Sequence, residues 1–264
     1  MQSRFFSFCA VLVLVAGCAS DPVGEPAGAE APVQAAADAA PAMITGDHIP
    51  TDTGDLIIHA ISHATFAMAW DGQVVYVDPV GGAEAFAGLP SPNVILLTDI
   101  HGDHLNGDTL AAVSTDATTI VAPAAVVEQL PEGLAGTVVT LANGEETTVA
   151  GIMVEAIPMY NLTEDRLGFH EMGRGNGYVV TTGGVRSYIS GDTEDTPEMR
   201  ALEAIDVAFV CFNLPYTMTE DQAASAVNEF RPRIVYPYHY MGSDVDLFTS
   251  MVDEGIEVRV GGWY

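Results

Sequence analysis

The sequence predicts an α/β protein in which two packed β-sheets carry helices on their outer faces. Three observations predict this class: short runs rich in β-branched and aromatic residues recur along the chain, Gly, Pro and Asp separate them, and helical patterns lie between clusters of these runs in both halves. Two sheets with helices outside produce this alternation. The 264 residues, 48% of them hydrophobic, suffice for one large core or two small ones.

The first half of the folded part contains four predicted strands. They are LIIHAIS, TFAMAW, QVVYVDP and NVILLT, at residues 56–62, 65–70, 73–79 and 93–98. The pair Asp71-Gly72 predicts a hairpin turn between the second and the third. The fourth run is almost continuously apolar, which is typical of a strand covered on both faces. Helical patterns follow at residues 106–114 and 124–130.

The second half continues with short strands and then alternates strands with helices. Thr196 followed by Pro197 predicts one helix start, and Thr219 with Gln222 forms a capping-box pattern ahead of AASAVNEF. Strands are expected around Val138, Val149, Val154, Val179 and Tyr188, and the chain closes with a strand at 233–240, a helix at 244–255 and a strand at 256–262.

The amino terminus resembles a bacterial lipoprotein signal. Arg4 supplies positive charge, residues 5–15 form an apolar run too short to span a bilayer, and VAGC closes the segment at Cys18. The resemblance implies cleavage before Cys18, a lipid on its sulfur and, with Ala19 next, a place on the periplasmic side of the outer membrane. An ordinary secretory signal is the alternative. The expected parts are a signal peptide at 1–17, a disordered Ala/Pro/acidic tether at 18–54 and a folded domain at 55–264.

The charge of the chain argues against nucleic acid as a partner. Its 36 acidic and 8 basic side chains give a formal net charge of −28, which repels phosphate backbones. A small-molecule substrate and the membrane, reached through the lipid anchor, are the partners that we expect. Cys211 lies in the apolar run IDVAFVCF, so we interpret it as a core residue and not as a nucleophile.

The stretch ILLTDIHGDH, at residues 95–104, has the composition of a metal-binding loop. The strand is expected to end just before Asp99, so Asp99 and His101, two apart in extended chain, point the same way. The glycine that follows permits a sharp turn, which brings Asp103 and His104 toward a second position. Two pairs of nitrogen and oxygen ligands after a buried strand are what a centre of two metal ions needs.

This loop resembles the H-x-H-x-D-H signature of the metallo-β-lactamase superfamily. Asp192 in YISGDTED matches the metal-bridging aspartate of that family, and His239 in YPYHY matches its last histidine ligand. The order and spacing of these motifs resemble the branch that contains ascorbate-6-phosphate lactonase-like and N-acyl phosphatidylethanolamine phospholipase D-like members. The resemblance implies a four-layer αββα sandwich with two divalent metal ions at the sheet edges.

Two positions depart from the family signature, and both concern the first metal. Asp99 stands where the first histidine is usual, and AIPMYN places Asn161 where another histidine is expected. His170, nine residues further on, is the other candidate for that position. The carboxylate of Asp99 makes manganese, iron or magnesium credible beside zinc, which remains the first choice. The implied ligands are Asp99, His101 and either Asn161 or His170 for the first metal, and Asp103, His104 and His239 for the second, bridged by Asp192.

Two metal ions arranged in this way predict hydrolysis of an ester, lactone, amide or phosphodiester bond. They lower the pKa of a water between them, which provides a hydroxide nucleophile, and they polarise a carbonyl or phosphoryl oxygen. Asp103 and Asp192 are the predicted catalytic residues. Asp103 could orient the nucleophile or carry a proton to the leaving group.

Two further residues are expected near the metals. Asp78 in YVDPV is a candidate for a carboxylate that hydrogen-bonds a ligand histidine. His63 in AISHATF is placed near the site by the family resemblance, with a purely structural role as the alternative. For the whole chain, the alternative to an enzyme is a catalytically impaired protein of the same fold that serves as a binding or scaffold lipoprotein, which Asp99 and Asn161 would explain.

Overall fold

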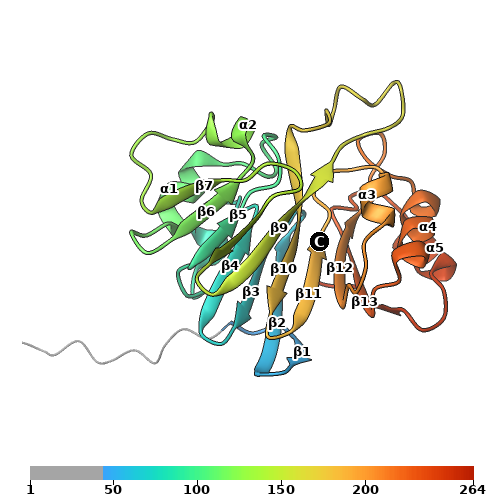
Figure 1. Cartoon of the computed structure of the whole chain (residues 1–264), viewed down its shortest axis with the longest axis horizontal. Helices are drawn as coiled ribbons and strands as arrows, with labels where there is room; N and C mark the ends of the chain where they lie inside the picture. Colours follow the sequence, from blue (N-terminus) through green and yellow to red (C-terminus); the bar gives the residue numbers. More distant parts are fainter. Residues whose placement is uncertain (1–43) are drawn as a thin grey trace, which may run out of the picture. The chain divides into compact units, whose positions relative to one another are not determined.

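Two seven-stranded sheets form the body of the protein in the computed structural model, which describes residues 44–264 (Figure 1). The first sheet contains, in spatial order, β1 (Asp47–Thr51), β2 (Gly54–Ser62), β3 (Thr65–Trp70), β4 (Gln73–Val77), β5 (Val94–Leu96), β6 (Thr119–Ala122) and β7 (Thr137–Thr140). The second contains β14 (Glu257–Val258), β13 (Ile234–Tyr238), β12 (Val207–Cys211), β11 (Val185–Ile189), β10 (Gly175–Thr182), β9 (Ile152–Met159) and β8 (Glu146–Val149).

Both sheets have the same internal arrangement. Strands β1 to β4 and β8 to β11 pair antiparallel, whereas β4 to β7 and β11 to β14 pair in parallel. Neighbouring parallel strands all end at the same edge of their sheet. The loops that follow them therefore meet, and these loops contain most of the predicted metal ligands.

Helices cover the outer face of each sheet (Figure 1). The first sheet has η1 (Ala83–Phe86), α1 (Gly107–Val113) and α2 (Ala124–Val127) beside it, and the second has α3 (Pro197–Arg200), α4 (Glu220–Phe230) and α5 (Val245–Met251). Val94 and Leu96 of β5 pack into a core shared with the second sheet, while Ile95, together with Leu97 just after the strand, packs with Leu110 of α1. Strand β5 is thus covered on both faces, as its apolar run predicts.

An aromatic cluster joins the two sheets beneath the predicted site. Phe66 of β3 stacks on Phe209 of β12 with ring centroids 4.4 Å apart, and Trp263 meets Phe66 edge-on at 5.4 Å. The carbonyl of Trp263 accepts a hydrogen bond from the backbone N–H of His63 at 3.3 Å. Buried aromatic contacts of this kind hold the strand ends, and with them the site residues, in place.

The predicted class of two sheets with outer helices is confirmed, as are the hairpin at Asp71-Gly72 and the capping box that begins α4. The predicted start of the folded domain at residue 55 was too late, because β1 lies at 47–51 and pairs with β2. Only Ile49 of β1 is buried, and Pro50 follows it, so the sequence has no strand pattern there. The last strand is also shorter than predicted: it ends at Val258, and the chain beyond it places Trp263 in the core.

None of the helices within residues 44–264 is long and apolar enough to cross a membrane. The predicted signal peptide, the lipidation site at Cys18 and the tether up to residue 43 lie outside the described residues.

Candidate metal centre

The predicted ligands meet at the edge where the parallel strands end, a common place for binding sites in such sheets. Each loop places one or more side chains in the site, because the strand before it ends at that edge. The contributing residues are Asp99, His101, Asp103 and His104 after β5, Asp192 after β11, His239 after β13, His63 in the turn between β2 and β3, and His170 in the loop between β9 and β10.

A first group of ligand atoms belongs to Asp99, His101 and His170, which lie within 4.8 Å of one another. His101 Nδ1 is 2.7 Å and His170 Nε2 is 3.6 Å from Asp99 Oδ2. The amide nitrogen of Asn161 instead donates to two backbone carbonyl oxygens, at 3.0 and 2.7 Å, and so holds neighbouring loops together. Of the two candidates for the third ligand, the structure brings His170 to Asp99.

A second group consists of His104, Asp192 and His239, again with ligand atoms within 4.8 Å. Asp192 also contacts the first group. Its Oδ2 lies 3.3 Å from Nε2 of both His104 and His170, and its Oδ1 lies 3.3 Å from His239 Nε2. Asp192 therefore lies between the two groups and contacts both.

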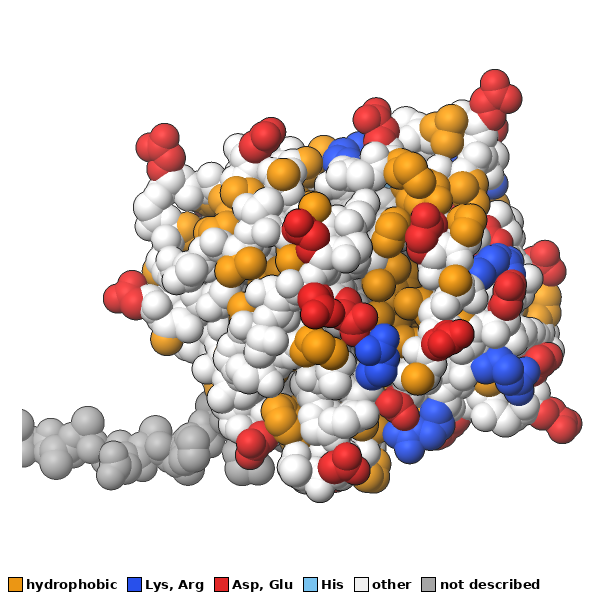
Figure 2. All heavy atoms as spheres, in the orientation of Figure 1, with side chains coloured by type: hydrophobic (Ala, Val, Ile, Leu, Met, Phe, Trp, Pro, Cys, Tyr) orange, Lys and Arg blue, Asp and Glu red, His pale blue; other side chains and the backbone are white. Residues whose placement is uncertain are grey.

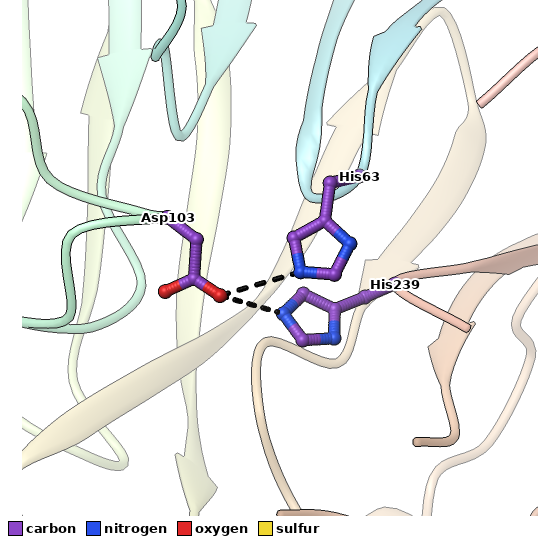
Figure 3. Close-up of side chains that lie close together, drawn as sticks. All are labelled: His63, Asp103 and His239. Carbon is purple, nitrogen blue, oxygen red and sulfur yellow. Dashed lines mark hydrogen bonds and ion pairs between the residues drawn. The ribbon is translucent and has the colours of Figure 1, made fainter. Parts of the chain in front are cut away.

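Asp103 and His63 extend the second group, as Figure 3 shows. His63 Nε2 and His239 Nε2 lie 3.3 and 3.4 Å from Asp103 Oδ2, and the two imidazole rings stack with centroids 3.7 Å apart. The other ring nitrogen of His63, Nδ1, forms a hydrogen bond with the Tyr264 hydroxyl. His63 thus touches two of the predicted ligands directly, a closer position than the outer role expected from the sequence.

Several buried ligand atoms have no hydrogen-bond partner. They include Asp99 Oδ1, Asp192 Oδ1, His104 Nε2 and His239 Nε2. An unpaired buried polar atom costs about 1–3 kcal/mol, yet here His104 Nε2 and His239 Nε2 each lie 3.3 Å from an oxygen of Asp192. Cations held between Asp192 and the two histidines would satisfy three of the four atoms, so the residues fit a site for divalent metal ions.

The carboxylates of the centre are held ionised. Burial by itself would raise the pKa of Asp192, but the charges of His239 and His104 hold that pKa well below its usual value. The pKa values of Asp99 and Asp103 are also lowered, because their contacts with neighbouring histidines outweigh their burial. Three anionic groups in one place favour binding of cations.

Asp78 supports His104 from behind the centre. Its Oδ2 accepts hydrogen bonds from His104 Nδ1 at 2.8 Å and from the Thr98 hydroxyl at 2.6 Å, while its Oδ1 accepts one from the Thr98 backbone N–H at 2.8 Å. These bonds leave Nε2 of His104 directed at Asp192. The carboxylate–histidine pair that the sequence predicts for Asp78 is present, and such a pair fixes the orientation of a metal ligand.

The backbone at three of these positions is left-handed. His63, Asp78 and His239 have φ values of 52°, 43° and 48°. Such conformations cost side chains other than glycine about 1–3 kcal/mol and concentrate at functional sites. The backbone N–H of His239 donates to the carbonyl of His63 at 3.2 Å, which links two of the three.

Arg174 belongs to the centre but was not predicted. Its guanidinium lies 3.4 Å from Asp99 Oδ2 and 3.5 Å from His101 Nε2, and it also donates to the carbonyl of Phe169. It adds positive charge beside the first group and ties the loop between β9 and β10 to it. The sequence offers one sign of this role: Arg174 lies four residues after His170, in a chain with only 8 basic residues.

A cavity of about 340 Å³ opens over the centre. Its volume suits a small molecule. It is lined by six residues of the centre and by four others: His63, His101, Asp103, His170, Asp192 and His239, with Phe169, Asn213, Tyr216 and Met241.

Comparisons with known proteins assign this fold and site to a family. Residues 57–239 match the model of the Beta-lactamase superfamily domain. A metal-dependent hydrolase from Thermococcus onnurineus is 29% identical over 216 residues, which cover 77% of this chain and 95% of the relative. The crystal structure of a protein assigned as a metal-dependent hydrolase from Parabacteroides distasonis shares 37% identity, with a TM-score of 0.77, over 84% of this chain and 100% of that one. Igni18, a metallo hydrolase from Ignicoccus hospitalis, has the same fold at 21% identity, with a TM-score of 0.65 and coverage of 78% and 94%.

The chain belongs to the metallo-β-lactamase superfamily. It is a metal-dependent hydrolase with the metallo-β-lactamase fold, and the two packed sheets with outer helices are the architecture that the sequence predicts.

Proposed function

We propose that the centre binds two divalent cations, with zinc as the first choice and manganese or iron as alternatives, and that the enzyme hydrolyses an ester, lactone, amide or phosphodiester bond of a small molecule. The observation that carries this proposal is the position of Asp192, whose oxygens lie 3.3 Å from nitrogens of His170, His104 and His239. One carboxylate between two ligand groups is the arrangement of a two-metal site.

The cations would supply Lewis-acid activation of water and of the carbonyl or phosphoryl oxygen of the substrate. Side chains of the protein would transfer the proton. The Asp103 side chain is 47% exposed in the cavity and lies against His63 and His239, so it can accept a proton from the attacking water and pass it to the leaving group. His63 also forms a hydrogen bond with Tyr264, whose side chain is exposed. These contacts link Asp103 to the protein surface.

The scaffold alternative depended on Asp99 and Asn161 as signs of an incomplete first site. His170 contacts both Asp99 and Asp192, at 3.6 and 3.3 Å, so the first group has three ligands without Asn161. This geometry favours an enzyme over a catalytically impaired scaffold protein.

An assay of the purified protein, loaded in turn with zinc, manganese and iron, tests the proposal. We expect turnover of at least one of p-nitrophenyl acetate, a γ-lactone, an anilide and bis-p-nitrophenyl phosphate, lost on chelation and in both Asp192→Asn and His104→Ala. Asp116→Asn, an exposed aspartate before β6, is the matched control and should keep full activity. Turnover that persists in metal-free protein or in Asp192→Asn would contradict the proposal.

For the location of the enzyme we propose the cell envelope, with a lipid on Cys18. The supporting observation is the VAGC sequence after an apolar run of the right length.

A further inference from the structure

Most of the exposed large hydrophobic side chains lie on the loops that surround the metal centre. Within residues 44–264, six of ten such side chains come from three loops around the centre, with exposed fractions from 45% for Leu167 to 65% for Met172. Scattered exposed apolar residues are ordinary, but a contiguous group marks a binding surface. We call this group the apolar rim: Leu162, Leu167 and Met172 after β9, Leu214 and Tyr216 after β12, and Met241 after β13.

The loops of the apolar rim are fixed to one another. The Asn161 amide donates to the carbonyl of Tyr216 at 2.7 Å, and the Arg166 guanidinium donates to the carbonyl of Thr217 at 2.6 Å. The rings of Phe169 and Tyr216 pack edge to face, 5.1 Å apart. These contacts join the loop after β9 to the loop after β12, so these two parts of the rim are preformed.

His170 lines two hollows beside this surface. One is the metal cavity, and the other is a more open hollow of about 320 Å³ lined by Leu162, Leu167 and Met172 among others. Figure 2 shows hydrophobic side chains gathered at the upper right, where Figure 1 places the loop between β9 and β10. A molecule that lies on the metals can therefore extend past His170 along an apolar path.

We infer that the substrate is an amphiphile, with a hydrolysable head group on the metal centre and a linear acyl or alkyl chain on the apolar rim. The inference rests on the proposed function and names its substrate class. Leucine and methionine side chains remove the methylenes of such a chain from water, and methionine adapts to chains of different length. The occupant is part of the substrate, and not a second protein, because the rim continues directly into the cavity through Phe169 and Tyr216.

Binding of n-alkyl hydroxamates to the metal-loaded full chain tests this inference. The hydroxamate group chelates metal ions whichever bond the enzyme cleaves, and acetyl, hexanoyl and decanoyl forms vary the chain alone. We expect the Kd from calorimetry to fall about two- to fourfold for each added methylene that the rim buries. Met172→Ser and Leu167→Ser should lose most of this gain, whereas Val138→Ser and Val260→Ser, exposed residues outside the rim, should keep it.

Equal affinity for the three hydroxamates would overturn the inference and leave the hydrolase proposal standing, because the head group would still bind. Absence of binding by all three would contradict both. If the rim instead holds a second copy of the chain, sedimentation will show a concentration-dependent dimer that Met172→Ser weakens, with no dependence of affinity on chain length. That result would also overturn the inference.

Discussion

His104 Nδ1 lies 2.8 Å from Asp78 Oδ2, and both side chains are fully buried. His48 and Asp55 form a similar pair at 3.0 Å, but their side chains are 57% and 49% exposed. A surface pair contributes about 0–1 kcal/mol, whereas the buried pair orients a metal ligand. The two pairs share the same chemistry and differ in location, so they can be compared directly.

Replacing Asp78 with Ala should weaken metal binding by about 10–100-fold, because His104 loses the bond that fixes its ring. It should also destabilise the fold by about 1–3 kcal/mol, since buried donors lose their partner. Metal retained during dialysis against graded chelator measures the first effect, and thermal unfolding measures the second. Asp55→Ala is the control and should behave as the wild type. Equal metal retention by the two variants would exclude the orienting role of Asp78.

His170→Ala should bind one metal equivalent fewer than the wild type, because His170 completes the first group beside Asp99. Asn161→Ala should keep both equivalents, since the Asn161 amide binds backbone carbonyls. Elemental analysis after gel filtration distinguishes the two variants. Loss of metal from Asn161→Ala alone would reverse the assignment.

Cys211 should resist alkylation in the folded protein. Its side chain is fully buried, and burial raises the pKa of its thiol to about 12, so the reactive thiolate is scarce. Iodoacetamide at pH 8, followed by peptide mass spectrometry, should label Cys211 at least about a hundredfold more slowly in native than in denatured protein. Rapid labelling of the native protein would show that the strand β12 opens.

Cys18→Ser should release the protein from the membrane fraction of a Gram-negative host. The lipid is expected on the Cys18 sulfur, and a serine cannot carry the thioether. Incorporation of a labelled fatty acid into the wild type, and its absence from the variant, checks the modification itself. A wild type that is recovered entirely in the soluble fraction would contradict lipid anchoring.

The parts of the site that follow one strand could be predicted from the sequence. The apolar run before Asp99 marks β5, and the spacing of His101, Asp103 and His104 within a turn is a local property. The Asp78 contact could also be predicted, because Asp78 directly follows the adjacent parallel strand β4. Residues this close to the end of a strand keep their relative positions in the folded protein, so the sequence is enough to predict them.

The remaining parts depend on contacts between distant segments, which no local pattern records. His63 and Tyr264 are 201 residues apart in the chain, and the choice of His170 depends on how the loop after β9 folds back. The guanidinium of Arg174 reaches Asp99 for the same reason. Strand β1 escaped prediction because Ile49 is its only buried residue, which leaves no alternating pattern in the sequence.

The number of metal ions bound at saturation tests the central claim most directly. Elemental analysis of the wild-type protein, titrated with zinc and freed of excess metal, should give two equivalents per chain, and Asp192→Ala should give fewer, because Asp192 contacts both ligand groups. A wild type that saturates at one equivalent, or that binds none, would contradict the two-metal centre.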